Sequence, residues 1–239
     1  MEERFVARRR TVPVSLNAVL FDLDGTLCEH AQSAESVYSG AFETAGIDRF
    51  GQPEELWAAL EEPPNHDDPV GHFAAGFATV AARHRRTPVD AVALARGFLE
   101  TVDYSDVRPR EGAGAAVEAA KRNGSIGLVT NGPASRQAGK LGALPFGDDF
   151  ETVVYAGDLP RRKPNREPFE AALSALSVRA DKAVYVGNSL KYDVVGAQNV
   201  GMAAAWCPSD DDCDPAPYSP EYVIESPDRI EGILEEGSK

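Results

Sequence analysis

The sequence is poor in cysteine and in long apolar stretches, and each shortage excludes a class of protein. Its 239 residues include three cysteines, Cys28, Cys207 and Cys213, which form no C-x-x-C pair and leave an odd thiol. A disulfide scaffold is therefore excluded, and a reducing cytoplasm is the simpler expectation. No run approaches the roughly 20 apolar residues of a membrane-spanning helix, and the first residues precede no apolar segment of signal-peptide length. The sequence predicts a soluble cytoplasmic protein.

Positive charge is also scarce. Lys and Arg number 24 against 38 Asp and Glu, which gives a formal net charge of −14, and only six of these cations are lysines. Such a surface repels phosphate backbones and anionic lipids, so we expect neither a nucleic acid nor a membrane as a partner. The acidity leaves two interpretations open: a GC-rich genome, or a salt-rich cytoplasm in which excess carboxylate keeps proteins soluble.

Short apolar runs alternate with helical patterns along most of the chain. The runs are typical of buried strands, and the segments between them are typical of crossover helices. Strands are expected at 18–21, 126–130, 152–155, 183–187 and 203–207, with a short last strand near 222–224. Helices are expected at 112–122, 166–176 and 228–236. This alternation predicts an α/β fold with a parallel sheet.

Residues 28–107 break this rhythm, because the interval contains no convincing strand. Helices are expected there at 33–46, 54–61, 71–86 and 88–101. An all-helical block that follows the first strand of a parallel α/β core suggests a cap domain over the core. The predicted domains are an N-terminal arm (1–16), an α/β core (17–27 and 108–239) and the inserted helical cap (28–107).

The clearest chemical signal is the segment Phe21–Leu27, which reads FDLDGTL at the end of the first expected strand. Asp22 and Asp24 are two positions apart, so in an extended segment they point the same way, and Gly25 permits a tight turn. Ligands of open α/β sheets bind at the carboxyl ends of the strands. One carboxylate can be a nucleophile and the other an acid and base, provided that a divalent cation reduces their repulsion.

This segment resembles the first motif of the haloacid dehalogenase (HAD) superfamily, and three later segments resemble the other motifs in the same order. Leu128–Gly132 places Thr130 and Asn131 after an apolar strand, as in the second motif. Lys163, which is followed by proline, resembles the third motif, and Gly187–Asp193 resembles the fourth. The resemblance covers nearly the whole chain. It implies a Rossmann-like core with a small helical (C1) cap.

The resemblance also implies a chemistry. The family's phosphatases, including those that resemble phosphoglycolate phosphatase, hydrolyse phosphomonoesters through an aspartyl-phosphate and use Mg²⁺ as cofactor. The implied catalytic residues are Asp22 as nucleophile, Asp24 as acid and base, Thr130 and Lys163. The substrate phosphate is expected at Gly25, Thr130, Asn131 and Lys163. The Mg²⁺ ion is expected at Asp22, Asp24, Asp193 and Asn188.

Asn188 departs from the family pattern, because the family's phosphatases usually have an acid at this position. Its amide carbonyl can ligate a cation but brings no negative charge, so weaker metal binding is expected. Three alternatives to a phosphatase stay open: a phosphomutase, a 2-haloacid dehalogenase-like hydrolase, and a catalytically weak phospho-ligand binding protein. Asp24 favours phosphate chemistry, because dehalogenases of the family lack an acid there.

The identity of the substrate is expected to depend on the cap, and the partner implied is a small phosphorylated metabolite. Polar candidates in the cap are His66, His72 and residues 83–86. A solvated helix end is the favoured interpretation of residues 83–86, and the two histidines are expected at the surface. Trp57, Phe73 and Phe77 are expected in the cap core. The protein is expected to be a monomer or a homodimer.

Overall fold

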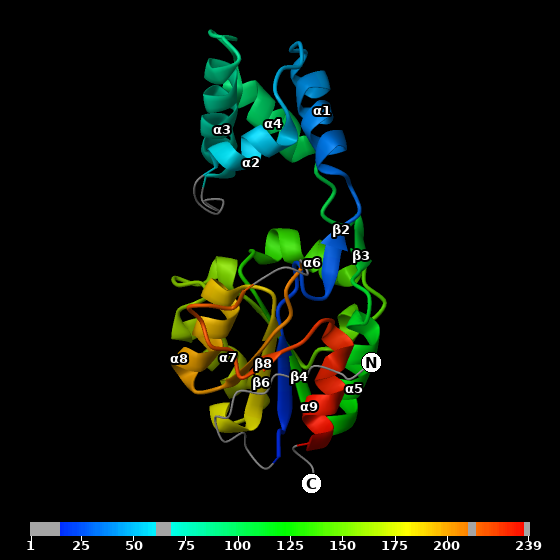
Figure 1. Cartoon of the computed structure of the whole chain (residues 1–239). Helices are drawn as coiled ribbons and strands as arrows, with labels where there is room; N and C mark the ends of the chain where they lie inside the picture. Colours follow the sequence, from blue (N-terminus) through cyan, green and yellow to red (C-terminus); the bar gives the residue numbers. More distant parts are fainter. Residues whose placement is uncertain (1–14, 61–67, 210–213, 237–239) are drawn as a thin grey trace, which may run out of the picture. The chain divides into compact units, whose positions relative to one another are not determined.

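The computed structural model describes residues 15–60, 68–209 and 214–236, and the chain divides into two compact units. One unit combines residues 1–29 with 107–239, and the other consists of residues 30–106 (Figure 1). The expected N-terminal arm therefore lies almost wholly outside the described residues, as do His66 and Cys213. Each unit has a hydrophobic core of its own.

A parallel sheet forms the centre of the first unit. Its strands in the described part of the chain are β1 (Ala18–Phe21), β4 (Ser125–Thr130), β5 (Thr152–Tyr155), β6 (Ala183–Gly187), β7 (Ala203–Trp206) and β8 (Tyr222–Val223). Their order is β5-β4-β1-β6-β7-β8, and each neighbouring pair is parallel. Every expected strand is thus confirmed to within one residue at each end. Because β4 and β6 flank β1 on opposite sides, the carboxyl end of β1 lies at the point where the strand order reverses, where ligands bind.

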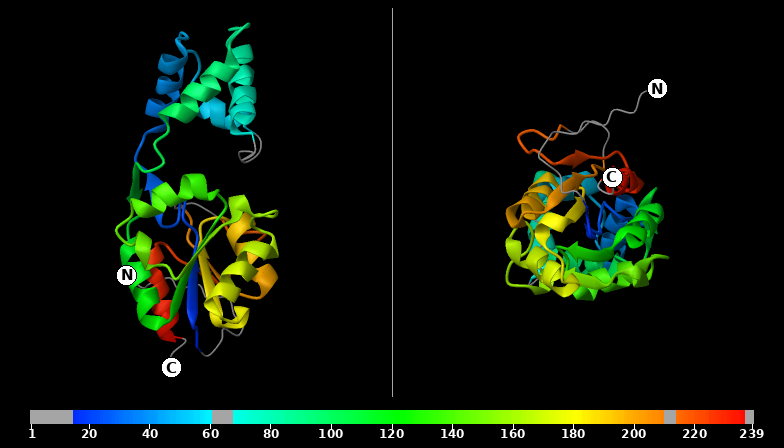
Figure 2. Two further views of the ribbon diagram at one scale, coloured as in Figure 1. Left: turned by 180° about the vertical axis from the view of Figure 1, so that it is seen from behind. Right: turned by 90° about the horizontal axis from the view of Figure 1, so that it is seen from below.

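Helices cover both faces of this sheet (Figure 2). Val19 and Phe21 of β1 pack in one core cluster with α5 (Ala113–Asn123) and α9 (Ile230–Glu236). Leu20 points to the opposite face and packs in a second cluster with α7 (Arg166–Leu176) and α8 (Val195–Val200). The remaining helical segments of this unit are α6 (Ala134–Gly142), the 3₁₀ turns η1 (Gly147–Asp149), η2 (Ala156–Asp158), η3 (Ala180–Lys182) and η5 (Pro227–Arg229), and the π-helical turn η4 (Leu190–Val194). Successive residues of β1 thus pack on opposite faces of the sheet, and the structure confirms the α/β fold with a parallel sheet that the sequence predicts.

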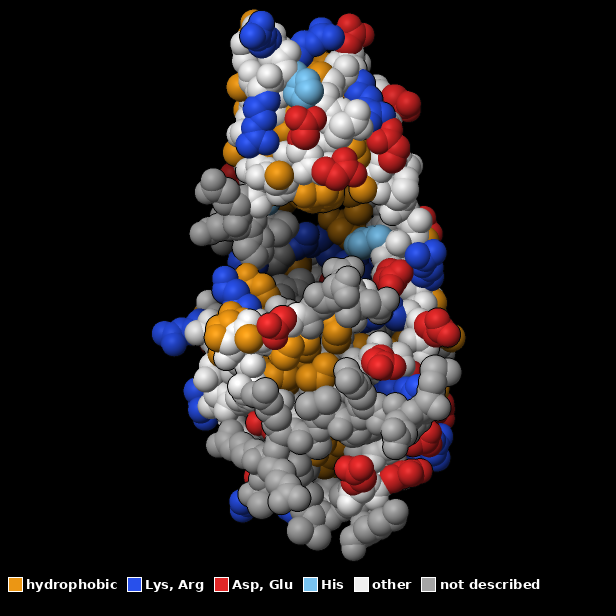
Figure 3. Space-filling view, in the orientation of Figure 1, with side chains coloured by type: hydrophobic (Ala, Val, Ile, Leu, Met, Phe, Trp, Pro, Cys, Tyr) orange, Lys and Arg blue, Asp and Glu red, His pale blue; other side chains and the backbone are white. Residues whose placement is uncertain are grey.

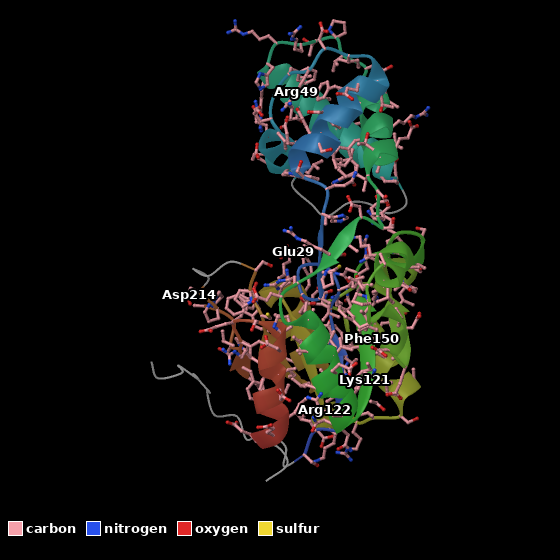
Figure 4. The ribbon with its side chains drawn as sticks, turned by 90° about the vertical axis from the view of Figure 1, so that its right-hand side faces the viewer. Glu29, Arg49, Lys121, Arg122, Phe150 and Asp214 are labelled. Carbon is pink, nitrogen blue, oxygen red and sulfur yellow. The ribbon has the colours of Figure 1, made fainter. Side chains whose placement is uncertain are left out.

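The expectation that residues 28–107 contain no strand is wrong at both ends of the interval. Cys28–His30 (β2) and Val107–Pro109 (β3) pair with each other as a small separate sheet. After the buried Cys28, the next two residues of β2 are exposed, so the strand lacks the apolar run that marks a buried strand. An ion pair between Glu29 (labelled in Figure 4) and Arg108, 3.2 Å between Oε2 and Nη2, joins the two strands.

The second unit is helical in its described residues. It contains α1 (Ala34–Ala45), α2 (Pro53–Ala59), α3 (Pro69–Arg83) and α4 (Ala91–Thr101), which confirms the four expected helices. Their starts follow from capping: the Asp90 carboxylate accepts from the backbone N–H of Ala93 at 2.9 Å, so α4 begins after Asp90 instead of at residue 88. The Asp68 carboxylate caps α3 in the same way.

Aromatic rings fill the core of this unit. Phe73 and Phe77 are buried as expected, and Phe77 stacks on Tyr38 with 5.8 Å between ring centroids. The expectation that Trp57 belongs to this core is wrong, because its side chain is 47% exposed. Trp57 meets Phe73 and Phe98 only edge-on, at 6.4 and 5.9 Å, near the end of the short helix α2. It therefore lies at the margin of the aromatic cluster.

The excess of acidic residues is distributed over the surface. On the face shown in Figure 3, acidic and basic side chains are interspersed on both units. Some of the acids form exposed ion pairs, such as Glu231 with Arg122 at 2.7 Å. Among the described residues, none of the helices combines the length and the apolar character that crossing a membrane requires.

Two glycine substitutions test the packing of the helices. A Cβ at Gly97 in α4 would lie 2.6 Å from the carbonyl oxygen of Ala41 in α1, so Gly97→Ala should lower the free energy of unfolding by about 1–3 kcal/mol. A Cβ at Gly139 in α6 meets no described atom within 4 Å, so Gly139→Ala should raise it by up to about 1 kcal/mol. Urea denaturation followed by circular dichroism measures both changes, and shifts of the same sign would contradict this account.

Candidate active site

Asp22 comes directly after β1 and is buried at the carboxyl edge of the sheet. Its backbone N–H donates to the carbonyl of Val186 at 2.9 Å, which continues the pairing of β1 with β6. Its Oδ1 accepts from Lys163 Nζ at 2.7 Å, and its Oδ2 accepts from the Thr26 hydroxyl at 3.2 Å. The sheet and these two donors together hold the carboxylate in one orientation.

Lys163 lies between β5 and α7, and its ammonium is the centre of a buried polar cluster. Its Nζ lies 2.7 Å from Asp22 Oδ1, 2.7 Å from Asp193 Oδ1, 2.9 Å from the Tyr185 hydroxyl and 3.0 Å from the carbonyl oxygen of Val129. The Lys163 side chain is only 2% exposed. An ammonium withdrawn from water to this extent is stable only with partners of this kind, because burying an unpaired charge is very costly.

The charges of this cluster do not balance. Burial by itself would lower the pKa of the Lys163 ammonium, but the carboxylates of Asp193 and Asp22 outweigh it and raise the pKa well above its usual value. Burial raises the pKa of Asp22 to about 7, against the attraction of Lys163 and with a further contribution from Asp193. Two buried carboxylates share one ammonium, so an additional cation at this edge would favour their ionised forms.

Asp193 and Asn188 belong to the segment that follows β6. Asp193 lies in η4, and its Oδ2 accepts from the backbone N–H of Ser189 at 2.9 Å. Asn188 donates from Nδ2 to the Ser209 hydroxyl at 3.2 Å. Gly25 turns with a positive φ of 74°, and a Cβ there would lie 2.3 Å from Asn188 Nδ2. The turn after β1 therefore packs directly on Asn188, and only glycine leaves room for this contact.

Thr130 is the last residue of β4, and Asn131 comes directly after it. The Asn131 side chain pairs with both backbone groups of Lys163: its Oδ1 accepts from the N–H at 2.8 Å, and its Nδ2 donates to the carbonyl at 3.2 Å. Asn131 therefore positions the segment that carries Lys163. The sequence alone does not reveal this role. Thr130 is buried, and its hydroxyl oxygen accepts from Gln137 Nε2 at 2.6 Å.

The Asp24 carboxylate is bonded by two side chains of α6. Lys140 Nζ lies 2.6 Å from Asp24 Oδ1, and Gln137 Nε2 lies 2.6 Å from Asp24 Oδ2. Because Gln137 also bonds Thr130, it joins the segment after β1 to the end of β4. Sequence reasoning missed Gln137, Lys140 and Tyr185. The sequence does carry a signal for Gln137 and Lys140. They are three residues apart in the helix that follows Thr130, so they lie on the same face of that helix.

Hydrogen bonds thus connect most of the residues that the sequence singled out. Asp22, Lys163, Asp193 and Asn131 form one network, Asp24 and Thr130 are joined through Gln137, and Asn188 contacts the Gly25 turn. The polar candidates of residues 30–106 belong to the other unit, where the His84 ring lies 2.9 Å from Glu55. The site described here is therefore built by the first unit alone.

The oxygen donors at this edge are of the type that Mg²⁺ takes. They are the carboxylates of Asp22 and Asp193, the Asn188 side-chain amide and the backbone carbonyl of Asp24. Within the described ranges, no group of three or more His, Cys, Asp or Glu side chains forms a metal site, and Lys163 bonds both buried carboxylates instead. The donor chemistry and the excess negative charge fit a divalent cation, and the four-residue ligand set stays a prediction.

The fold agrees with the comparisons to known proteins. The family model of haloacid dehalogenase-like hydrolases matches residues 16–201. The chain belongs to this family, which confirms the resemblance seen in the four motifs, and it is a hydrolase with a Rossmann-like α/β core.

Relatives along almost the full length support this assignment. The chain is 28% identical over 239 residues to glyceraldehyde 3-phosphate phosphatase of Methanopyrus kandleri, covering 94% of this chain and 99% of that protein. It is 27% identical over 251 residues to phosphoserine phosphatase of Thermus thermophilus, covering 92% and 97%. Among solved structures, the magnesium-bound HAD-hydrolase YfnB of Bacillus subtilis superposes with a TM-score of 0.74 at 21% identity, covering 92% and 99%.

Removing the buried ammonium tests the polar cluster. Lys163→Met should lower the free energy of unfolding by about 3–5 kcal/mol, because Asp22 and Asp193 lose their shared cation. Asp193→Asn in the same background should recover part of the loss. As a control, Lys121→Met removes an exposed lysine of α5 (Figure 4), for which the expected loss is below about 1 kcal/mol. Urea denaturation at pH 7 gives these values, and a wild-type midpoint for Lys163→Met would refute the role of the cluster in stability.

Proposed function

We propose that this protein is a Mg²⁺-dependent phosphomonoester hydrolase that acts on a small phosphorylated metabolite. The observation that carries the proposal is the pair of aspartates after β1, whose carboxylates have different surroundings. Asp22 is buried against the Lys163 ammonium, as suits a nucleophile, whereas Asp24 is half-exposed and held beside the Thr130 hydroxyl through Gln137. Relatives with phosphatase names that act on two different small phosphates, glyceraldehyde 3-phosphate and phosphoserine, support the same reaction class.

In the first half of the reaction, a carboxylate oxygen of Asp22 attacks the phosphorus of the substrate. The bond from Asp22 to phosphorus forms as the bond to the leaving oxygen breaks, and Asp24 transfers its proton to that oxygen, so an alcohol departs. The enzyme is left as an aspartyl-phosphate. Lys163 and the Thr130 hydroxyl provide positive charge and a hydrogen bond for the phosphoryl oxygens.

In the second half, the ionised Asp24 takes a proton from a water molecule whose oxygen attacks the phosphorus. The bond between phosphorus and Asp22 breaks, inorganic phosphate leaves, and both aspartates return to their starting states. Mg²⁺, when bound by Asp22, the Asp24 carbonyl, Asp193 and Asn188, would supply charge that offsets the repulsion between the carboxylates and the phosphate.

The contacts of Asp24 also bear on the alternatives. A phosphomutase would use the same aspartyl-phosphate but would pass the phosphoryl group to a second sugar hydroxyl, so release of inorganic phosphate separates it from a phosphatase. A dehalogenase forms no alcohol leaving group and has no use for a proton donor at Asp24. A non-catalytic phospho-ligand binding protein would bind phosphate without turnover.

Replacing the nucleophile tests the mechanism. Asp22→Asn should lower Mg²⁺-dependent phosphate release from p-nitrophenyl phosphate by about a thousandfold or more, because the amide cannot form the aspartyl-phosphate. Its circular dichroism spectrum should match that of the wild type. Asp181→Asn, which removes an exposed acid paired with Arg179, should leave the rate unchanged. Turnover by Asp22→Asn that is comparable to the wild type would refute the assigned role.

The amide at position 188 gives a second test. Asn188→Asp should lower the Mg²⁺ concentration for half-maximal turnover by about tenfold, because it adds a negative charge to the predicted donor set. Asn123→Asp makes the same change at the exposed end of α5 and should have no effect on the Mg²⁺ requirement. If both variants respond alike, or neither does, Asn188 is not a ligand.

A further inference from the structure

Helix α6 contributes two buried polar side chains to the active-site edge. Gln137 is 2% exposed, and the Lys140 side chain is 7% exposed, although lysine is rarely buried unless it is paired. The side chain that they contact, Asp24, is itself 47% exposed. The two buried donors therefore direct their N–H groups at a carboxylate at the surface of the site.

The surroundings of α6 fix these donors in place. The helix start is held by Asp158, whose Oδ2 accepts from the backbone N–H of Ala134 at 2.8 Å. Gly132 makes room for the glutamine, because a Cβ there would lie 2.5 Å from Gln137 Cδ. Leu141, next to the lysine, is buried in the core cluster of α5 and α9. The helix is therefore anchored at its start and along its apolar face.

Both N–H groups of the Gln137 side chain have a hydrogen-bond acceptor. Its Nε2 carries two N–H groups, which donate to Asp24 Oδ2 and Thr130 Oγ1, each at 2.6 Å. A single amide therefore bridges Asp24 and Thr130. Lys140 bonds the other carboxylate oxygen, so both oxygens of Asp24 have a donor from α6.

We propose that Gln137 and Lys140 are positioning residues for proton transfer by Asp24. They hold its carboxylate at a defined distance from the Thr130 hydroxyl, and thus from the phosphoryl group, so that the proton can reach the leaving oxygen. This inference rests on the proposed function, in which Asp24 protonates the alcohol that departs. A half-exposed aspartate without such donors would populate several rotamers, and misplacement by about 1 Å is enough to cost about a hundredfold in rate.

The inference predicts an effect that depends on the leaving group. A nitrophenolate departs without help, whereas a methylphenolate of similar size needs a proton. A lysine that merely binds the phosphate would affect both substrates equally. The experiment therefore compares kcat/KM for p-nitrophenyl phosphate and p-methylphenyl phosphate, with Mg²⁺ present, in the wild type and in Lys140→Met, Gln137→Met and Asp24→Asn.

We expect kcat/KM of Lys140→Met and Gln137→Met to fall at least about tenfold further for p-methylphenyl phosphate than for p-nitrophenyl phosphate, in the direction of Asp24→Asn. Lys140→Arg should restore much of the difference, and Lys121→Met should behave as the wild type. Equal losses on both substrates, or no loss, would overturn the inference. If one variant fails to fold, the other still decides.

Crystal structures of the wild type and Lys140→Met supply a readout that is independent of turnover. The Asp24 side chain should leave its wild-type rotamer in the variant, and an unchanged Asp24 would overturn the inference. If the wild type releases no phosphate from either substrate, the proposed function fails, and these structures still show whether α6 positions Asp24.

Discussion

The structure of the site depends on one buried ammonium. Lys163 bonds groups from three neighbouring strands: Asp22 after β1, the Val129 carbonyl on β4 and Tyr185 on β6. Since these strands are consecutive in the sheet, the lysine joins their carboxyl ends at one point. The same contacts that satisfy a charge removed from water thereby set the distances between the groups that carry the chemistry.

Much of the fold follows from local patterns in the sequence. Continuous apolar runs such as Ala18–Phe21 are typical of strands buried on both faces, and the structure confirms them almost to the residue. The paired aspartates are recognisable in the sequence because they lie close together at the end of such a run. Thr130 and Lys163 are indicated by the family resemblance, since neither has a strong local signal.

The rest depends on contacts between distant residues. Tyr185 reads as one more apolar residue of a buried strand, and only the approach of Lys163 gives its hydroxyl a role. Gln137 and Lys140 read as the polar side of an amphipathic helix, until the fold places that side against Asp24 instead of water. Trp57 shows the opposite case, since helical spacing suggested burial and the end of a short helix left it exposed.

The double hydrogen bond between Asn131 and Lys163 limits where the loop after β5 can change in length. The asparagine amide imitates a peptide group and bonds both backbone groups of Lys163, eight residues beyond the end of β5. The same loop is also held at its start, where the Gly157 N–H donates to the Gly132 carbonyl at 3.2 Å and Asp158 caps α6. Residues 159–162, which lie between these two anchors, are therefore the part of the loop whose length can change without removing a contact that places either the ammonium or α6.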